Sequence, residues 1–287
     1  MIRIGMDPNL FTIGTFSLSW HGLMTGLAVV AAIILLVKLS KGSEIAIESV
    51  YSAALWAILG GIVGARLVHV IDNWSLYNNN LLQILRFWEG GLSLYGAIYG
   101  GFLVGAAYCL LRKLPVGRLA DLAIPGVVLA QAIGRIGCLI NGDSYGTITS
   151  LPWGVVYTNS KAAATTILGE PARHPFPAYE IIWDLIIFAV LMRLRKRLKK
   201  DWMLFLLYAP MYSIERFLLS FLRGDEAAVL GGLHQSQVIS LVIMAVTIPL
   251  FILLARRRTP EPAEAATAIE DSMASETEPR SEPAEES

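Results

Sequence analysis

Long apolar runs limit what this chain can fold into. A helix needs about 20 mainly apolar residues to cross the roughly 30 Å hydrocarbon core of a bilayer. Seven stretches meet this requirement, with bounds 18–38, 48–71, 91–111, 119–140, 176–193, 202–222 and 236–255. Because 55% of the residues are hydrophobic and only 16% are charged, the composition is typical of a membrane protein and excludes a soluble domain built around one core.

The length and continuity of these runs predict helices, since the strands of a membrane barrel would alternate polar and apolar residues over about ten positions. Lysine and arginine then set the orientation, because cytoplasmic loops carry an excess of them. They gather on one side of the predicted spans, at Lys38, Lys41, Arg112, Lys113, Arg118, 193–200 and 256–258. The sequence therefore predicts an all-α integral membrane protein, a bundle of seven transmembrane helices with its N-terminus outside and its C-terminus in the cytoplasm.

The composition changes at Thr259. From there the chain is rich in Pro, Glu, Ala and Ser, and it has nine acidic residues against a single arginine, Arg280. Such a segment cannot bury enough apolar surface to fold. We expect a seven-span domain at 1–258 and a disordered acidic cytoplasmic tail at 259–287. The net charge of zero averages a basic membrane rim and this tail, and it gives no indication of nucleic-acid binding.

Three arginines, Arg66, Arg135 and Arg216, fall inside the predicted spans. Each costs about 2.5–3.5 kcal/mol at the centre of a lipid-exposed helix, so something must relieve them. One interpretation is internal pairing with acidic residues at similar depth, namely Asp143, Glu180, Asp184 and Glu215. The other is a cationic cavity open to the outer leaflet, in which guanidinium groups hold a phosphate through paired hydrogen bonds.

Further residues favour the cavity. Tyr212, Arg216 and Arg223 follow one another at helical spacing in the sixth predicted span, so they are expected to share one helix face. The segment 141–175 is the largest external piece of chain, and we expect it to cover the cavity, because long loops in compact bundles are often functional. The many glycines near the arginines indicate close helix packing and are weak signs of a site.

The two cysteines, Cys109 and Cys138, lie in different predicted spans and lack metal-ligand spacing. The sequence therefore predicts no metal, no cofactor and no disulfide framework. A cysteine buried in a membrane span is usually a small packing residue. Cys138 could alternatively place a thiol of the protein's own next to the phosphate.

Several short motifs occur in a fixed order along the chain. They are "SWHGLMTG", "GARLVHVI", "WEGGLSLYGA", "GRIGCLINGDSYG", "HPFPAYE", "YSIERFLLSFLRGDE" and "QSQVISL". In this order they resemble the bacterial prolipoprotein diacylglyceryl transferases over roughly residues 15–255. The resemblance implies a multi-pass enzyme of the bacterial inner membrane that moves a diacylglyceryl group from phosphatidylglycerol to the lipobox cysteine of a lipoprotein precursor. Phosphatidylglycerol, lipoprotein precursors and membrane lipid are thus the expected partners.

The resemblance also assigns roles to residues. Arg135 and Arg216 are expected to bind and stabilise the lipid phosphate. Asn141 and Gly142 would shape the turn of the signature motif, and Gly146 would close its loop. The expected substrate-binding residues are Arg66, Asn141, Gly142, Gly146, Tyr212 and Arg223.

The chain departs from the family pattern near the chemistry. The third-span motif usually carries a histidine, the favoured catalytic base of the family, and here that position is Tyr95. His21 replaces the usual first-span tyrosine, Cys138 replaces the first asparagine of the signature, and Ser220 replaces the usual sixth-span glutamate. The resemblance therefore indicates a divergent member.

The departures leave the choice of base open. A thiol that displaces a phosphate needs a group to take its proton, and the candidate catalytic residues for this step are His21 and Tyr95, beside Arg135 and Arg216. Histidine titrates near neutral pH, so His21 is the better match, although a histidine at a membrane boundary is often a packing residue. A lipid-binding or lipid-exporting paralog without transfer chemistry remains the alternative. A carrier is less favoured, because no pair of broken spans repeats between the two halves.

Overall fold

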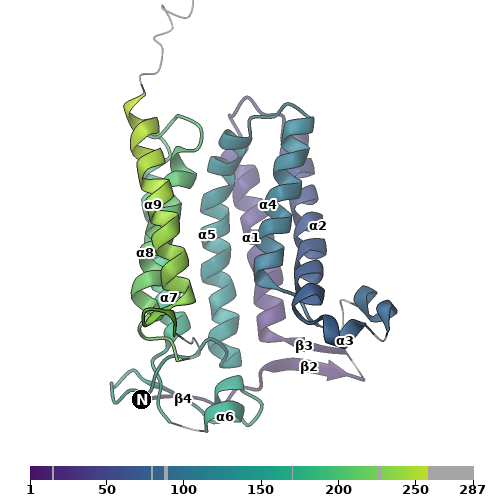
Figure 1. Cartoon of the computed structure of the whole chain (residues 1–287), viewed down its shortest axis with the longest axis vertical. Helices are drawn as coiled ribbons and strands as arrows, with labels where there is room; N and C mark the ends of the chain where they lie inside the picture. The colour runs from purple at the N-terminus through teal and green to yellow at the C-terminus, as the bar shows by residue number, and fades with distance from the viewer. Residues whose placement is uncertain (15, 79, 87–89, 170, 225–227, 258–287) are drawn as a thin grey trace, which may run out of the picture.

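The computed structural model describes residues 1–257 except 15, 79, 87–89, 170 and 225–227. Long helices run side by side, and short strands and a small helix gather at one end of the bundle (Figure 1). The long helices are α1 (Trp20–Ser40), α2 (Ile47–Asp72), α4 (Leu94–Leu111), α5 (Val116–Asn141), α7 (Phe176–Leu194), α8 (Met203–Ser220) and α9 (Gln235–Arg256). Each coincides with one predicted span to within three residues at either end.

Four of these helices, α1, α2, α5 and α9, are long and apolar enough to cross a membrane by length and composition. Helix α4 contributes a shorter apolar stretch, Tyr95–Leu111. Helices α7 and α8 hold buried acidic residues and an arginine, which lower their hydropathy. The structure is thus that of a largely helical membrane protein, and the count of seven spans and the orientation stay predictions.

The structure adds short strands to the expected all-α fold. In the described part, β1 (Ile2–Ile4) pairs in parallel with β4 (Val155–Tyr157), and β2 (Asn9–Ile13) pairs antiparallel with β3 (Phe16–Ser19). A third pair joins β5 (Ala228–Leu230) to β6 (Leu233–His234). Short helical turns complete the elements: α3 (Trp74–Tyr77), the 3-10 helix η1 (Leu81–Leu85) and α6 (Ala163–Leu168). The predicted external segment therefore contains β4 and α6 and is tied to the N-terminal strand.

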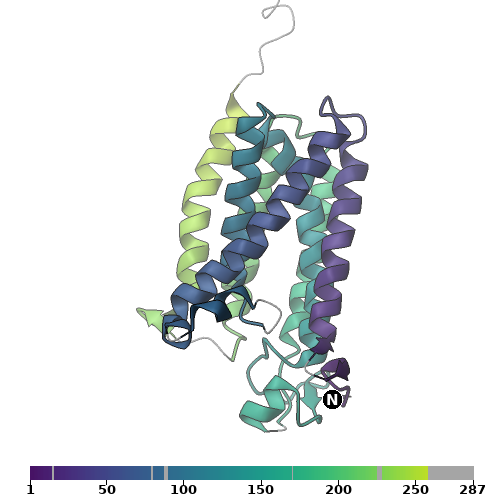
Figure 2. The same cartoon turned by 90° about the vertical axis from the view of Figure 1, so that its right-hand side faces the viewer.

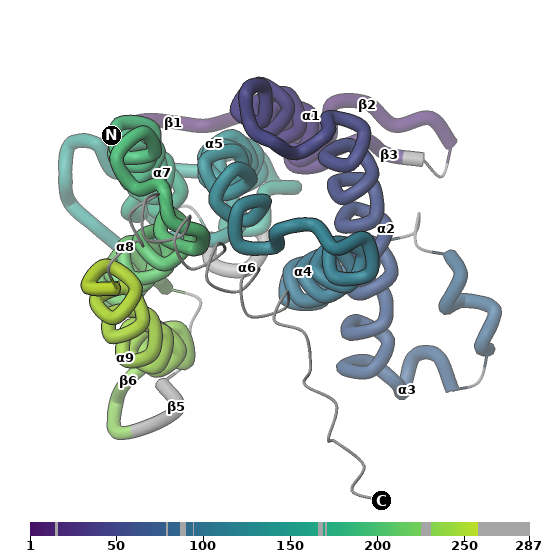
Figure 3. The backbone as a smooth tube through the Cα atoms, turned by 90° about the horizontal axis from the view of Figure 1, so that it is seen from above, coloured from purple at the N-terminus to yellow at the C-terminus, as the bar shows by residue number. Residues whose placement is uncertain are grey.

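The helices form two groups. Seen from above, α7, α8 and α9 lie on one side of α5, and α1, α2 and α4 lie on the other (Figure 3). The most extensive helix contacts join α2 to α4 and α1 to α5 (Figure 3). Figure 2 shows α2 crossing the bundle obliquely. Helix α5 is consequently the element that both groups share.

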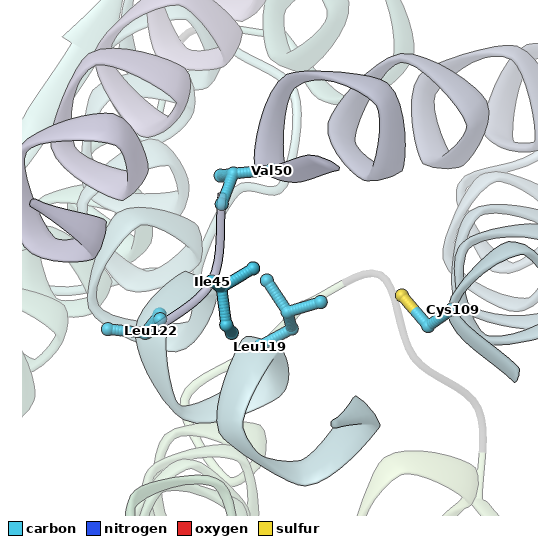
Figure 4. Close-up of a cluster of buried hydrophobic side chains, with 5 residues drawn as sticks. All are labelled: Ile45, Val50, Cys109, Leu119 and Leu122. Carbon is cyan, nitrogen blue, oxygen red and sulfur yellow. The ribbon is translucent and has the colours of Figure 1, made fainter. Parts of the chain in front are cut away.

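Two apolar clusters hold the bundle together. At the end opposite the strands, side chains meet from the segment before α2, the starts of α2 and α5 and the end of α4; they are Ile45, Val50, Cys109, Leu119 and Leu122 (Figure 4). Between α5, α7 and α8 a second cluster contains Ile124, Val128, Ile187, Leu191 and Leu204. Many apolar side chains of the outer helices are exposed, as expected where lipid is the solvent.

The predicted tail at 259–287 lies outside the described residues. Its disorder and the domain boundary at 258 therefore stay predictions.

Candidate active site

Two of the arginines predicted to lie inside the bundle meet at one carboxylate. The guanidinium of Arg135 on α5 lies 2.8 Å from Glu180 Oε1 on α7, and that of Arg216 on α8 donates to the same oxygen over 2.9 Å. Glu180 is 2% exposed, whereas the arginine side chains are 20% and 14% exposed. The internal pairing considered from the sequence is thus present. With Glu180 ionised, these three residues carry one net positive charge.

Further polar atoms are buried around this group. Asp184 follows Glu180 by one turn of α7, and Glu215 precedes Arg216 on α8; both side chains are buried. One carboxylate oxygen of each, and Oε2 of Glu180, has no hydrogen-bond partner within the described part of the chain. Unsatisfied buried polar atoms are rare in native proteins and need an explanation, which a bound ligand or water would supply.

Arg66 has a different environment. It is buried in α2, and its guanidinium donates to the backbone carbonyls of Gln83, Ile84, Gly90 and Gly91 over 2.6–2.9 Å. The guanidinium also stacks 5.1 Å from the centre of the Tyr77 ring. These hydrogen bonds attach α2 to η1 and to the two glycines before α4, and they do not join Arg66 to the Glu180 group.

The signature loop follows directly from the end of α5. Asn141 is the last residue of the helix, and Gly142 turns the chain with a φ of 71°, a conformation that glycine adopts without strain. After the turn, Ser144 Oγ accepts a hydrogen bond of 3.5 Å from Arg135. The Oδ1 atom of Asn141 is buried without a described partner. The turn therefore returns the loop to the arginine that α5 carries.

Gly146 closes this loop against two other segments. A Cβ at Gly146 would lie 2.6 Å from the Cβ of His174, so only glycine fits. Gly146 also pairs with Arg223 in an isolated antiparallel bridge. The expectation that Arg223 shares a helix face with Arg216 is wrong, because α8 ends at Ser220. The guanidinium of Arg223 instead lies 5.6 Å from the centre of the Phe176 ring, beside the signature loop.

Tyr212 does lie on α8, four residues before Arg216. Its ring stacks on Tyr208 with 5.6 Å between the ring centres, and the Tyr208 hydroxyl bonds to Gln131 Oε1 over 3.1 Å. Tyr212 also packs against the apolar cluster between α5, α7 and α8. It therefore marks the boundary between the apolar cluster and the arginines.

A second polar cluster lies where α1 begins. His21 Nδ1 is 3.5 Å from Cys138 Sγ and 3.6 Å from Asp143 Oδ2. The side chains of His21 and Asp143 are 44% and 39% exposed, and Cys138 is buried. Burial raises the pKa of the Asp143 carboxyl, and the nearby imidazole acts against this. Here α1 and α5 come close, since a Cβ at Gly137 would lie 2.7 Å from His21 Cα.

This cluster is not visible in the sequence. His21 is a candidate catalytic residue, Cys138 a departure from the family pattern and Asp143 a candidate partner of an arginine, but 117 positions separate His21 from Cys138. Only the packing of α1 on α5 brings them together.

Tyr95 lies elsewhere, at the start of α4. Its ring stacks on Tyr99 with 6.5 Å between the ring centres, and its side chain is half exposed. Within the part of the chain that the structure describes, no hydrogen bond joins Tyr95 to the cluster around His21. The structure therefore gives the two candidates for proton removal different surroundings.

Comparison with known proteins agrees with these motifs. The family model described as prolipoprotein diacylglyceryl transferase matches residues 8–253. Similar proteins include the phosphatidylglycerol–prolipoprotein diacylglyceryl transferase of Dehalococcoides mccartyi, 40% identical over 259 residues, which are 90% of this chain and 97% of the relative. The enzyme of the same name from Clostridioides difficile is 37% identical over 83% of this chain and 91% of its own length.

A third relative with this name, from a Nostoc species, is 34% identical over 89% of this chain and 92% of its own length. The matches thus run through both helix groups and through the signature loop between them. The chain belongs to the prolipoprotein diacylglyceryl transferase family.

Proposed function

We propose that this protein transfers the diacylglyceryl group of phosphatidylglycerol to the lipobox cysteine thiol of a lipoprotein precursor, forming a thioether and releasing glycerol phosphate. The names of its relatives state both substrates. The observation that carries the proposal is the pair of arginines on α5 and α8 that share a single oxygen of Glu180. Two guanidinium groups held side by side by one carboxylate oxygen suit a site that receives a phosphate.

The chemistry needs these arginines in place before the reaction. As the bond between the glyceryl carbon and the phosphate oxygen breaks, negative charge grows on the departing phosphate. Arginine stays charged at any relevant pH, and its planar fork matches phosphate oxygens. Because Glu180 orients both guanidinium groups, they can stabilise this charge without rearranging during the reaction.

Apart from Arg66, we assign the remaining predicted residues to the surroundings of this phosphate site. We assign to Asn141, Gly142 and Gly146 the shaping of the loop that covers it. Tyr212 would line its apolar side, where the acyl chains enter. Arg223, which is bridged to Gly146, would add positive charge at the rim. For Arg66 the backbone contacts support a structural role, so a direct contact with lipid has the weakest support.

The thiol is proposed to react at the end of the site where His21 lies. The sulfur attacks the glyceryl carbon, the C–S bond forms, and the electron pair of the broken C–O bond leaves with glycerol phosphate. His21 is partly exposed beside Asp143, and its Nδ1 lies 3.5 Å from the sulfur of Cys138, which follows Arg135 by three residues on α5. These surroundings favour His21 over Tyr95 as the side chain that acts on the thiol.

We also propose that all seven long helices span the inner membrane and that the site faces the outer leaflet. Arg135 lies six residues before the end of α5, about 9 Å along the helix axis. The strands and α6 lie at that end of the bundle (Figure 1). The basic residues gather at the other end, which the excess of lysine and arginine assigns to the cytoplasm.

Two experiments test the proposal. A reporter fused after Lys199 should be cytoplasmic, and one inserted at Asn159 should be external; the reverse result would remove the outer-leaflet site. Expression of the chain in a transferase-depleted bacterium should restore growth and lipoprotein modification. A protein that inserts correctly, binds phosphatidylglycerol and restores neither would instead be a lipid-binding paralog.

A further inference from the structure

We propose that His21, Cys138 and Asp143 hold a divalent metal ion of the zinc type and that the open position of this metal takes the substrate thiol. The first half of the proposal concerns a binding site in this chain. The second half rests on the proposed transferase function. Both differ from the expectation of no metal, which follows from the lack of ligand spacing between the two cysteines.

The positions of the three side chains suit one ion. Tetrahedral zinc with bonds of about 2.0–2.3 Å places its sulfur, nitrogen and oxygen ligands about 3.4–3.6 Å from one another. The observed separations are 3.5 Å from His21 Nδ1 to Cys138 Sγ and 3.6 Å from His21 Nδ1 to Asp143 Oδ2. All three candidate ligand atoms lie within 4.8 Å of one another. A small rotation of one side chain would therefore complete the geometry.

Rigid elements present these ligands. Ser19 caps the first turn of α1, where its hydroxyl accepts a hydrogen bond of 3.0 Å from Gly22, and His21 belongs to that turn. Cys138 lies in the last turn of α5, next to Gly137, whose missing side chain lets α1 approach. The left-handed turn at Gly142 then brings Asp143 back over the helix end. The start of α1, the end of α5 and the turn after it thus hold the three side chains close to one another.

The donor set is one that zinc selects. Thiolate, imidazole and carboxylate are its usual protein ligands, and three of them with one open position are typical of catalytic zinc. The Oδ1 atom of Asp143 is buried and has no hydrogen-bond partner in the described part of the chain, so the carboxylate has unused coordinating capacity. Exposure of 44% at His21 and 39% at Asp143 provides a path for the ion.

The charges also balance. The Cys138 thiolate and the Asp143 carboxylate together neutralise a divalent ion. The neighbouring cation, Arg135, is bound to Glu180 at 2.8 Å. Before the substrate thiol binds, the metal site therefore adds no net charge beside the arginine that is proposed to hold the phosphate.

With such an ion in place, His21 acts on the thiol through the metal that it binds and does not itself take the proton. A thiol that coordinates zinc is deprotonated outright, so no histidine is needed at the position of Tyr95. The bound thiolate attacks the glyceryl carbon, the C–S bond forms, and the C–O electron pair leaves on the phosphate oxygen. The thiol proton passes to solvent or to the released phosphate monoester. The phosphate site and the thiol site then lie on the same helix end, at Arg135 and Cys138.

Cobalt binding tests the site directly. The full-length protein, purified in detergent and stripped with a chelator, is titrated with Co²⁺ and followed by its thiolate-to-cobalt charge-transfer absorption. We expect one ion per protein. Cys138→Ser should abolish this absorption. Asp143→Asn should weaken cobalt binding about 10-fold or more, and the absorption should still appear at higher cobalt concentrations. The matched control Cys109→Ser, which changes the other buried cysteine, should bind like the wild type.

Failure of the site is visible without any assay of transfer. If the unaltered protein shows no thiolate absorption with Co²⁺, or if Cys109→Ser removes it as fully as Cys138→Ser does, the metal site is overturned. The titration of the unaltered protein decides this even where Cys138→Ser does not fold.

An activity measurement tests the second half. Chelator treatment should lower thioether formation on a lipobox peptide by about 10-fold or more, and Zn²⁺ should restore it. Transfer that continues unchanged in metal-free protein would overturn activation of the thiol by metal and leave the transferase function intact. Cobalt binding in a protein that shows no transfer with any metal would overturn the proposed function and leave the metal site standing.

Discussion

Two helix interfaces of this bundle are built in opposite ways. Between α2 and α4 the backbones touch: a Cβ at Gly64 would lie 2.4 Å from the Gly96 carbonyl oxygen, and one at Gly100 would lie 2.3 Å from the Gly60 carbonyl oxygen. Between α5, α7 and α8, by contrast, arginines and carboxylates meet around Glu180. The first interface depends on missing side chains, and the second combines an apolar cluster with buried charged side chains.

The difference between the two interfaces indicates which residues serve stability and which serve function. In lipid no hydrophobic driving force brings helices together, so close backbone packing is a main source of attraction between them. The α2–α4 contact provides such packing. Charged side chains inside a membrane are costly, so they usually mark a functional site. A change among the charged residues around Glu180 should therefore remove activity, and a change in the α2–α4 interface should remove stability.

The largest effect is expected from Arg135→Ala. It removes one of two cations that would stabilise the departing phosphate, so transfer should fall about 10²–10³-fold. Glu180 keeps its bond to Arg216, and for this reason the variant should remain folded in the membrane. Thioether formation on a lipobox peptide with phosphatidylglycerol in detergent measures the loss, with thermal unfolding as the check on folding.

Arg112→Ala is the control, because it removes an arginine at the end of α4, away from the site. Arg216→Lys sharpens the test, since an ammonium keeps the charge but lacks the bidentate fork, and it too should fall well below the wild type. Near-wild-type transfer in Arg135→Ala would make this arginine structural and would assign both interfaces to stability.

The next effect concerns His21. Because it lies beside Cys138 and Asp143, His21→Phe should lower the rate of transfer about 10²-fold. Tyr95→Phe should cost less, as its ring stacks on Tyr99 near the α2–α4 interface. Rates for the two variants under saturating phosphatidylglycerol decide between them. Full activity in His21→Phe together with total loss in Tyr95→Phe would move the thiol chemistry to α4.

The two interfaces differ also in how far the sequence predicted them. Glycines at helical spacing indicate close packing by themselves, and the structure has it at Gly64 and Gly100. The arginines at depth indicated a need for partners but not which ones. Glu180 was one of several candidates, and its role as the shared partner of Arg135 and Arg216 depends on how α7 lies between α5 and α8.

The prediction of neighbours from helical spacing fails where the chain leaves a helix. Arg223 was placed on the face of Arg216 by extending helical spacing, but α8 ends at Ser220, and a turn redirects the chain to Gly146. Asp143 is one of several candidate partners of an arginine by depth, and the turn at Gly142 also places its carboxylate 3.6 Å from His21 Nδ1. Helical spacing predicts which side chains are neighbours within a helix. It gives no information about residues beyond the cap of that helix.

A smaller effect is expected within the glycine interface. Gly100→Ala places a Cβ 2.3 Å from a backbone carbonyl oxygen, so α2 and α4 must move apart, at a cost of about 1–3 kcal/mol of stability. Thermal unfolding in detergent should occur at a lower temperature. Transfer per folded molecule should change much less than in Arg135→Ala. A 10²-fold loss of transfer at unchanged stability would mean that this interface, too, belongs to the site.

The smallest effect is expected one residue further along α4. A Cβ at Gly101 would lie 3.1 Å from the Ala57 carbonyl oxygen, a tight contact that a shift of a few tenths of an ångström relieves. Alanine is also a better helix former than glycine by about 0.5–1 kcal/mol, which offsets the strain. Gly101→Ala should therefore change stability by less than about 0.5 kcal/mol, measured beside Gly100→Ala in the same detergent. Equal destabilisation by both would show that the whole face of α4, and not the row of shortest backbone contacts, sets the distance to α2.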